Sequence, residues 1–485
     1  MRFDPQAPAT GPMPTYEDRG DAGYHRSLGS LQIQMIAIGG AIGVGLFLGV
    51  GARLAAAGPA LILAYLVVGV VVYLMMRALG EMVVYRPTTG AWVSYAREFV
   101  SDRLAFMTGW IHVTLAAVAG VAEIAALAVY VQFWWPELPG WIPSLVAALA
   151  IVGCNLLSVR WFGAIETTAS SVKVIAILLF LAAGIVLVVA GDVFHAPTTA
   201  SVSHLWANGG FAPNGLLPLL VVLGGVVFSF SAIETVGVSA GEAADPERSM
   251  PRAINSVVLR IGLFYIGSLI ALSVLLPTDQ YSGDESPFVT ALASLHIPGI
   301  AGIMNFVVLT AAISGVNATL YSSVRVLRNL AAHGQAPRVT VRVSSRGVPA
   351  GALLSVLGVY LLGIVLIYAL GASAAFEVIL SACAVFILFG WISILVSHLG
   401  YRRAVAAGRA HAVHFRLPGA PVTTWVALAF LVGVALYVMF DQANPHWYYS
   451  LIAGVVILVA TNVGYELSRR HVQRHGLPEL TGHRR

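Results

Sequence analysis

Apolar runs long enough to cross a bilayer alternate with short polar stretches along most of this chain. A helix needs about 20 predominantly apolar residues to cross the hydrocarbon core of a membrane. The pattern predicts an all-α polytopic membrane protein with twelve transmembrane helices, a tail at 1–30 and another at 467–485. The predicted spans are 31–54, 60–84, 104–133, 141–158, 164–190, 214–240, 255–276, 297–330, 350–370, 374–399, 423–440 and 447–466.

The composition excludes a soluble globular protein. Of the 485 residues, 58% are hydrophobic and only 10% are charged, whereas charged residues approach a quarter of soluble domains. The pI near 9.2 does not indicate nucleic-acid binding, because the basic residues cluster in alternate loops. Cys154 and Cys383 lie in apolar runs, so we expect small buried side chains, not a disulfide or a metal site. Residues 1–30 are polar and contain no apolar core of a cleavable signal peptide.

Arginine marks one side of the predicted membrane. The N-terminal tail, the loops after the even-numbered spans and the C-terminal tail carry most of it, whereas the intervening loops carry acids. The exception is Arg53, near the end of the first span. Because cytoplasmic loops are enriched in basic residues, this distribution predicts that both termini are cytoplasmic.

A glycine-rich run interrupts the first span. Gly39, Gly40, Gly43 and Gly45 fall within seven residues, and each weakens a helix by about 1 kcal/mol relative to alanine. Broken backbone survives in a membrane where it lines a cavity, with freed amides facing an anion and freed carbonyls facing a cation. An amino acid zwitterion carries both charges. The alternative is close helix packing through small residues.

A second interruption is predicted in the sixth span, where three hydroxyl residues, Glu234 and Gly237 lie in an apolar run at 228–237. If spans one and six are equivalent, 31–190 and 214–399 form a 5+5 inverted repeat, with 423–466 adding two extra helices. Transporters of this plan bind substrate between two broken helices. The alternative is that the Ser and Thr side chains mediate helix contacts.

Lys173 is the only lysine among 27 basic residues, so the other 26 are arginine. It lies inside the fifth span. Arginine stays protonated in proteins, whereas a buried lysine can release its proton. Lys173 is therefore predicted to take part in proton coupling. A lysine that reaches to the membrane interface, or a fixed cation that joins two helices, are the alternatives.

The remaining charges within the predicted spans are acids. Glu123 lies deep in the third span, where it either lines a substrate path or is a buried hydrogen-bonded acid. Glu234 either caps the second half of the broken sixth span or exchanges protons, and Glu377 lies near the start of the tenth span. Glu81 and Glu166 lie nearer the ends predicted to be cytoplasmic, where pairing with arginine is the ordinary explanation.

Several motifs together resemble the amino acid permeases of the amino acid–polyamine–organocation superfamily, and specifically the bacterial amino acid transporter family. The resemblance covers 23–465. Its most specific motifs lie at 34–43 (QMIAIGGAIG), 77–81 (RALGE), 94–99 (SYAREF), 251–255 (PRAIN), 317–325 (NATLYSSVR) and 346–349 (RGVP).

The resemblance implies roles for individual residues. The amides of Gly43, Val44 and Gly45 would bind the substrate carboxylate, and Phe228 would lie as a gate over the substrate. The carbonyls of Ala41, Phe228 and Ser231 would bind the substrate amine. Lys173 matches a lysine whose ammonium takes the place of sodium in proton-coupled relatives. The implied protein is a bacterial inner-membrane symporter that works by alternating access, without a cofactor.

Within the family, residues 23–25, 49–54, 260–265 and 416–421 are most like those of L-asparagine permeases. The implied substrates are a proton and a small neutral amino acid, L-asparagine first. Segment 113–117 and Glu123 depart from the expected pattern, and 203–206 is shared with permeases for D-serine, D-alanine and glycine, the nearest alternative. A non-coupled facilitator or an amino acid sensor would share the fold. No enzymatic motif and no metal-spaced His/Cys set is apparent.

Overall fold

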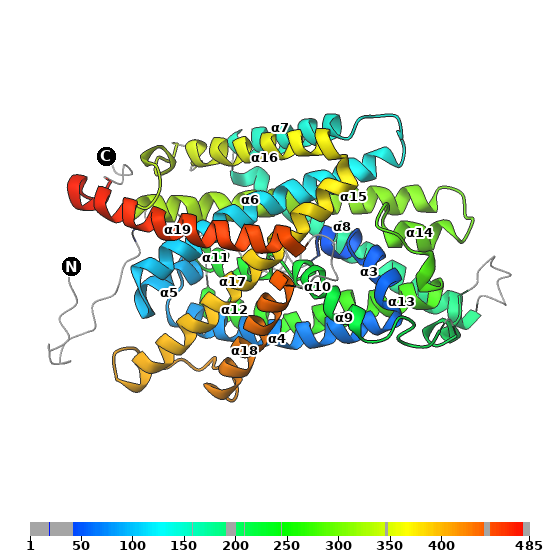
Figure 1. Cartoon of the computed structure of the whole chain (residues 1–485), viewed down its shortest axis with the longest axis horizontal. Helices are drawn as coiled ribbons and strands as arrows, with labels where there is room; N and C mark the ends of the chain where they lie inside the picture. Colours follow the sequence, from blue (N-terminus) through cyan, green and yellow to red (C-terminus); the bar gives the residue numbers. More distant parts are fainter. Residues whose placement is uncertain are drawn as a thin grey trace.

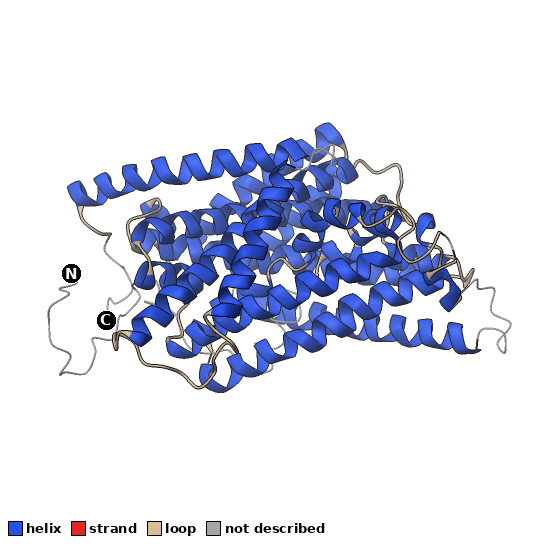
Figure 2. Cartoon of the chain, turned by 60° about the horizontal axis from the view of Figure 1, so that its bottom comes forward, coloured by secondary structure: helices blue, strands red, loops and turns tan. Residues whose placement is uncertain are grey.

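The computed structural model describes Arg19 and residues 42–157, 159–190, 200–207, 209–243, 245–344, 348–440 and 447–478. Helices dominate these residues, and no β-strand occurs among them. Most of the long helices run side by side in one bundle (Figures 1 and 2). The predicted all-α class is confirmed for this part of the chain.

Helices or broken helices occur at all the predicted apolar runs. The main elements are α2 (Val44–Phe47), α3 (Val50–Ala57), α4 (Leu61–Tyr85), α5 (Ala91–Phe99), α6 (Asp102–Gln132), α7 (Trp141–Leu157), α8 (Val159–Ala190), α9 (Leu217–Val221), α10 (Leu223–Ser229), α11 (Val236–Ser239), α12 (Pro246–Arg260), α13 (Ser268–Leu275), α14 (Pro287–Ala293), α15 (Ile300–Ala332), α16 (Ala350–Leu370), α17 (Ala372–Ala406), α18 (Val422–Phe440) and α19 (Trp447–His475).

In the described residues, nine stretches are long and apolar enough to cross a membrane. Two shorter apolar helices, Trp141–Leu156 and Leu223–Ser239, accompany them. The predicted number of twelve counts these shorter stretches and a first span that lies partly outside the described residues. The helix count and the repeat therefore stay predictions.

Several elements differ from the sequence prediction. α5 and α14 are short helices in regions predicted to be loops, and α12 begins at Pro246, nine residues before the predicted span. Asp245 caps α12 by accepting from the Arg248 amide, which fixes this earlier start. α19 continues to His475, beyond the predicted end at 466.

The burial pattern separates a central set of helices from an outer one. α6 has buried residues on all sides and packs against α15 and α17. By contrast, α8, α16, α18 and α19 expose apolar side chains, among them Leu179, Leu362 and Val426. Exposed apolar residues over whole helix faces are what lipid contact requires. The structure therefore fits a multi-pass membrane protein.

Candidate functional site

A small cavity lies where two interrupted helices meet α6 and α15. It is lined by Gly43, Gly45, Ala119, Glu123, Phe228, Ser229, Ser231, Ala232, Gly315, Ala318 and Thr319. Its volume is about 20 Å³, which is room for about one water molecule. Five of the predicted site residues, Gly43, Gly45, Glu123, Phe228 and Ser231, line this cavity together.

The first interruption begins at Gly43, whose backbone is extended (φ −121°, ψ −169°) directly before α2. The amides of Val44 and Gly45 are the first of α2, so they have no carbonyl partner within that helix. The predicted carbonyl ligand Ala41 lies outside the described residues, as do Gly39 and Gly40. Glycine is required at position 45 because α2 approaches α10 closely there: a Cβ at this position would lie 2.7 Å from Ser229 Cα.

The second interruption follows α10. Ala232 adopts a left-handed conformation (φ 64°), and a short 3₁₀ turn at Ile233–Thr235 leads into α11. The Phe228 carbonyl accepts the Ser231 amide at 2.9 Å, and the Phe230 amide is also directed at it. The Phe228 ring is buried and packs edge-on to Phe376, with ring centroids 6.4 Å apart. The predicted break in the sixth span is therefore present.

Glu123 places a carboxylate between the two interruptions. The Val44 amide donates a hydrogen bond to this carboxylate. Its Oε2 is buried without a hydrogen-bond partner among the described residues. Gly315 of α15 makes room for the side chain, because a Cβ there would lie 2.3 Å from Glu123 Cδ. The arrangement leaves one carboxylate oxygen available to a donor from a ligand.

Hydroxyl groups hold the ends of the interrupted helices in place. Ser229 Oγ donates to the Gly45 carbonyl at 2.9 Å and lies 2.7 Å from the hydroxyl of Tyr65. The hydroxyl of Tyr265 donates to the Ser229 carbonyl at 2.7 Å. Arg53, the arginine outside the loop pattern, is buried and donates to the Gly45 carbonyl at 3.3 Å. These bonds satisfy carbonyls near the cavity and join the two interruptions.

Lys173 lies beside the cavity and does not line it. Its side chain is fully buried and its ammonium is hydrogen-bonded inside the bundle, which argues against a lysine that reaches to the interface. Nζ donates to the Ile42 carbonyl and to Ser314 Oγ, each at 3.0 Å. Ser314 in turn donates to the carboxylate of Glu166 at 3.0 Å.

Glu166 has partners that the sequence did not predict. Its carboxylate is buried and interacts with Lys173 and Ser314, and no arginine is among its partners in the described part of the chain. Lys173 thus links the start of the first interruption to α8 and α15.

Glu234 lies after the second interruption but does not line the cavity. It is buried, and its Oε2 accepts a hydrogen bond from Trp391 Nε1 at 3.2 Å. Its carboxylate also accepts a hydrogen bond from its own backbone amide, in the 3₁₀ turn that begins the second half of the broken span. Glu377 is half-buried in α17 and is likewise not part of the cavity lining.

Comparison with known proteins identifies the family of this chain. The amino acid permease family model matches residues 32–475. The chain is 44% identical to the L-asparagine permease of Salmonella typhimurium over 465 residues, which cover 95% of this chain and 93% of that protein. It is 44% identical to the L-asparagine permease of Escherichia coli K12, over 93% and 90% of the two chains. It is 45% identical to L-asparagine permease 2 of Mycobacterium bovis, over 92% and 91%.

The chain belongs to the amino acid permease family. The family resemblance seen in the sequence is thereby confirmed.

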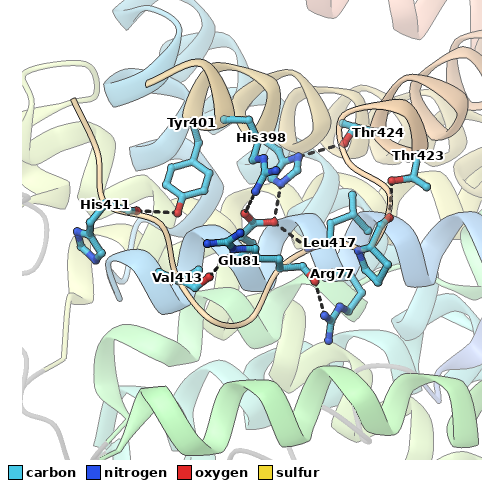
Figure 3. Close-up of polar contacts among 12 residues, drawn as sticks. Arg77, Glu81, His398, Tyr401, His411, Val413, Leu417, Thr423 and Thr424 are labelled. Carbon is cyan, nitrogen blue, oxygen red and sulfur yellow. Dashed lines mark hydrogen bonds and ion pairs between the residues drawn. The ribbon is translucent and has the colours of Figure 1, made fainter. Parts of the chain in front are cut away.

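Two of the sequence motifs of this permease meet away from the cavity, around Glu81 (Figure 3). The buried Glu81 carboxylate accepts from His398 Nε2 at 3.0 Å, Arg402 Nη1 at 2.9 Å and the Leu417 amide at 2.8 Å. Arg77, one turn earlier, donates to the Arg416 carbonyl. The predicted pairing of Glu81 with an arginine is confirmed. The motif at 77–81 thus fastens α4 to α17 and to the segment before α18.

Sequence reasoning missed part of the permease cavity. Ser229, Ala119 and the α15 residues Gly315, Ala318 and Thr319 were not predicted. One signal could have found α15: Ser314, Gly315 and Asn317 form a small polar cluster inside an apolar run, much as in the sixth span.

Proposed function

We propose that this permease is a proton-coupled symporter that imports a small neutral amino acid, L-asparagine first, by alternating access. The observation that carries the proposal is the enclosure of one cavity by two interrupted helices, with the first amides of α2, the Phe228 ring and an acid at its wall. The names of the similar proteins, L-asparagine permeases, support the substrate.

In this proposal the substrate carboxylate binds the amides of Gly43, Val44 and Gly45. Its amine binds carbonyls of Ala41, Phe228 and Ser231. The Gly45 amide, which lacks a carbonyl partner within α2, supports the first assignment. The Val44 amide donates to Glu123 and would exchange that bond for one to the substrate. The position of Phe228 and Ser231 in the cavity wall supports the second assignment. The buried Oε2 of Glu123 is available to accept from the amine or from the side-chain amide of asparagine.

The size of the cavity supports alternating access. Sites for small molecules usually enclose about 300 Å³ or more. A cavity of about 20 Å³ must therefore widen before an amino acid enters, and Phe228 is the lining side chain large enough to act as the gate. We assign 31–190 and 214–399 to the two inverted repeats, because the interruptions at Gly43 and Ala232 reach the same cavity.

Lys173 is the proposed coupling residue. Its ammonium donates a hydrogen bond to the Ile42 carbonyl, which directly precedes the amides proposed to bind the substrate. Loss of the proton would remove the attraction to Glu166 and weaken the hold on Ile42, so protonation and the position of the first interruption would depend on each other. Glu234 is the second proposed coupling residue, although it contacts Trp391 instead of this network.

The proposed location is the bacterial inner membrane, with both termini cytoplasmic. Support comes from the arginine-rich loops. α5, which contains Arg97, and the arginine-rich end of α19 lie at one end of the bundle, whereas α14 lies toward the other (Figure 1).

Competition for uptake tests the substrate. Purified protein in proteoliposomes, energised by an inward proton gradient, should take up labelled L-asparagine, and excess unlabelled L-asparagine should suppress this uptake far more than glycine or D-alanine. A site that hydrogen-bonds a side-chain amide loses much of its affinity when the amide is missing. Stronger competition by D-alanine would assign the protein to the D-serine, D-alanine and glycine permeases. Absence of uptake, with binding retained, would indicate a sensor.

A further inference from the structure

A groove far from the substrate cavity lies between α6, α19 and the loop that follows α15. Its volume is about 900 Å³. Phe106, Trp110 and Thr114 form one wall, spaced one helical turn apart along α6. Ile457, Ala460 and Leu467 belong to the α19 wall.

The groove runs from bilayer depth to the arginine-rich end of the bundle. Ile457 lies within the apolar part of α19, whereas His471 and His475 lie 14 and 18 residues further along this helix. At 1.5 Å per residue, the groove spans about 27 Å along α19. Trp110 lies near the start of α6, and its Nε1 donates to the Gln335 carbonyl at 2.9 Å. Tryptophan at this depth is typical of the boundary between hydrocarbon and headgroups.

The two ends of the groove differ in chemistry. The inner part is apolar, because Phe106, Ile457, Ala460 and Leu467 line it. The outer end carries Arg338 and the stacked imidazoles of His471 and His475, with ring centroids 4.4 Å apart. Arg469, Arg470 and Arg474 lie in the same two turns of α19 but outside the groove lining. Glu466 is the acid nearest to them on α19, and it already pairs with Arg103 and Arg469.

We propose that this groove binds one anionic phospholipid, with an acyl chain between α6 and α19 and the phosphate at Arg338 and His471. Basic pockets between transmembrane helices at the headgroup level are suited to anionic headgroups. Without a lipid, the apolar wall would face water or bulk hydrocarbon. The acyl chain of an anionic lipid covers this wall, and its phosphate pairs with the basic end.

Another occupant is the N-terminal tail of the same chain, since Arg19 donates to the Pro478 carbonyl at 3.0 Å, close to the end of α19. The chemistry disfavours it. Residues 1–30 are polar and charged, and burying such residues against Phe106 and Ile457 at bilayer depth would leave polar groups unpaired.

Native mass spectrometry of the delipidated full-length protein tests the proposal. Phosphatidylglycerol and phosphatidylcholine with identical acyl chains are titrated separately, and one phosphatidylglycerol should bind more tightly. Ala460→Trp, which fills the apolar wall, should abolish this binding. Val459→Trp is the matched control, because Val459 is 58% exposed, adjacent in sequence and outside the groove lining, and it should bind as wild type does.

The basic end is tested by Arg338→Gln, a change at an exposed position that should leave the fold intact. It should weaken phosphatidylglycerol binding about fivefold, the equivalent of about 1 kcal/mol for one basic residue at the membrane surface. Phosphatidylcholine binding should change less. The same change at Arg474, outside the groove lining, is the control.

Two results would overturn the proposal. One is equal lipid binding by Ala460→Trp and Val459→Trp. The other is absence of bound lipid in the wild type together with its appearance after deletion of residues 2–30, which would show that the tail occupies the groove.

Discussion

The close approach of α2 and α10 makes Gly45→Ala an informative change. The added methyl would lie 2.7 Å from Ser229 Cα and 3.2 Å from both the Ser229 nitrogen and Phe228 Cδ1. Carbon atoms pack at about 3.5–4.0 Å, so the two interrupted helices must separate by about 1 Å. The nearest contact is backbone, which cannot rotate away.

Overpacking of this kind costs about 1–3 kcal/mol. Because Ser229 and Phe228 line the cavity, we expect the cost to appear in substrate binding, as a loss of affinity of about 5- to 150-fold. At Gly43 the added methyl would lie 3.0 Å from Glu123 Oε1, the end of a rotatable side chain. Gly43→Ala should therefore lose less than about fivefold, the lower limit of the overpacking range.

The assay is binding of labelled L-asparagine to purified protein, with thermal unfolding as the check on folding. Gly433→Ala is the control, because Gly433 lies in α18 and a methyl added there would meet no other atom within 4 Å among the described residues. This control should bind as wild type does. Wild-type affinity in a folded Gly45→Ala protein would refute the reasoning, as would an equal loss in Gly433→Ala.

Two further predictions concern buried hydrogen bonds. Tyr265→Phe removes the hydroxyl that donates to the Ser229 carbonyl, so it should cost about 1–3 kcal/mol of stability and weaken L-asparagine binding. Tyr281→Phe removes a similar bond, to the Leu272 carbonyl, between residues outside the cavity lining, so it should lower the thermal stability without weakening binding. Glu81→Gln should lower the free energy of unfolding by about 3 kcal/mol, because Arg402 loses its carboxylate partner. A variant whose free energy of unfolding in detergent equals that of the wild type would contradict this.

The sequence predicted local features of this fold well. Apolar runs of about 20 residues placed the helices, and the clusters of glycine and hydroxyl residues located both interruptions, because hydropathy and backbone propensity act over short distances. α5 and α14 were missed, since 91–99 and 287–293 are too short to register as spans. The end of α19 was missed because a helix that continues beyond the hydrocarbon loses its apolar pattern.

The site was predictable only in part, because pairing between distant helices leaves no local pattern. Glu166 and Lys173 are seven residues apart on α8, yet their connection runs through Ser314 of α15. In the same way, the sequence singled out 77–81 and 416–421 separately, and only the folded chain brings Glu81 to the Leu417 amide. The sequence placed Glu123 within a span. It could not predict that Gly315 of α15 leaves space for this side chain, because that space arises from the packing of α6 on α15.

Coupling of amino acid and proton entry is the central claim, and one paired measurement tests it most directly. Uptake of labelled L-asparagine and the response of an internal pH-sensitive dye are recorded in the same proteoliposomes, for wild type, Lys173→Ala and Lys173→Arg. Arginine keeps its charge and cannot release the proton, and alanine carries none. The account predicts that both signals rise together in the wild type and that neither variant accumulates substrate in response to a proton gradient. Proton-driven accumulation by Lys173→Arg would contradict it and leave Lys173 as a fixed structural cation.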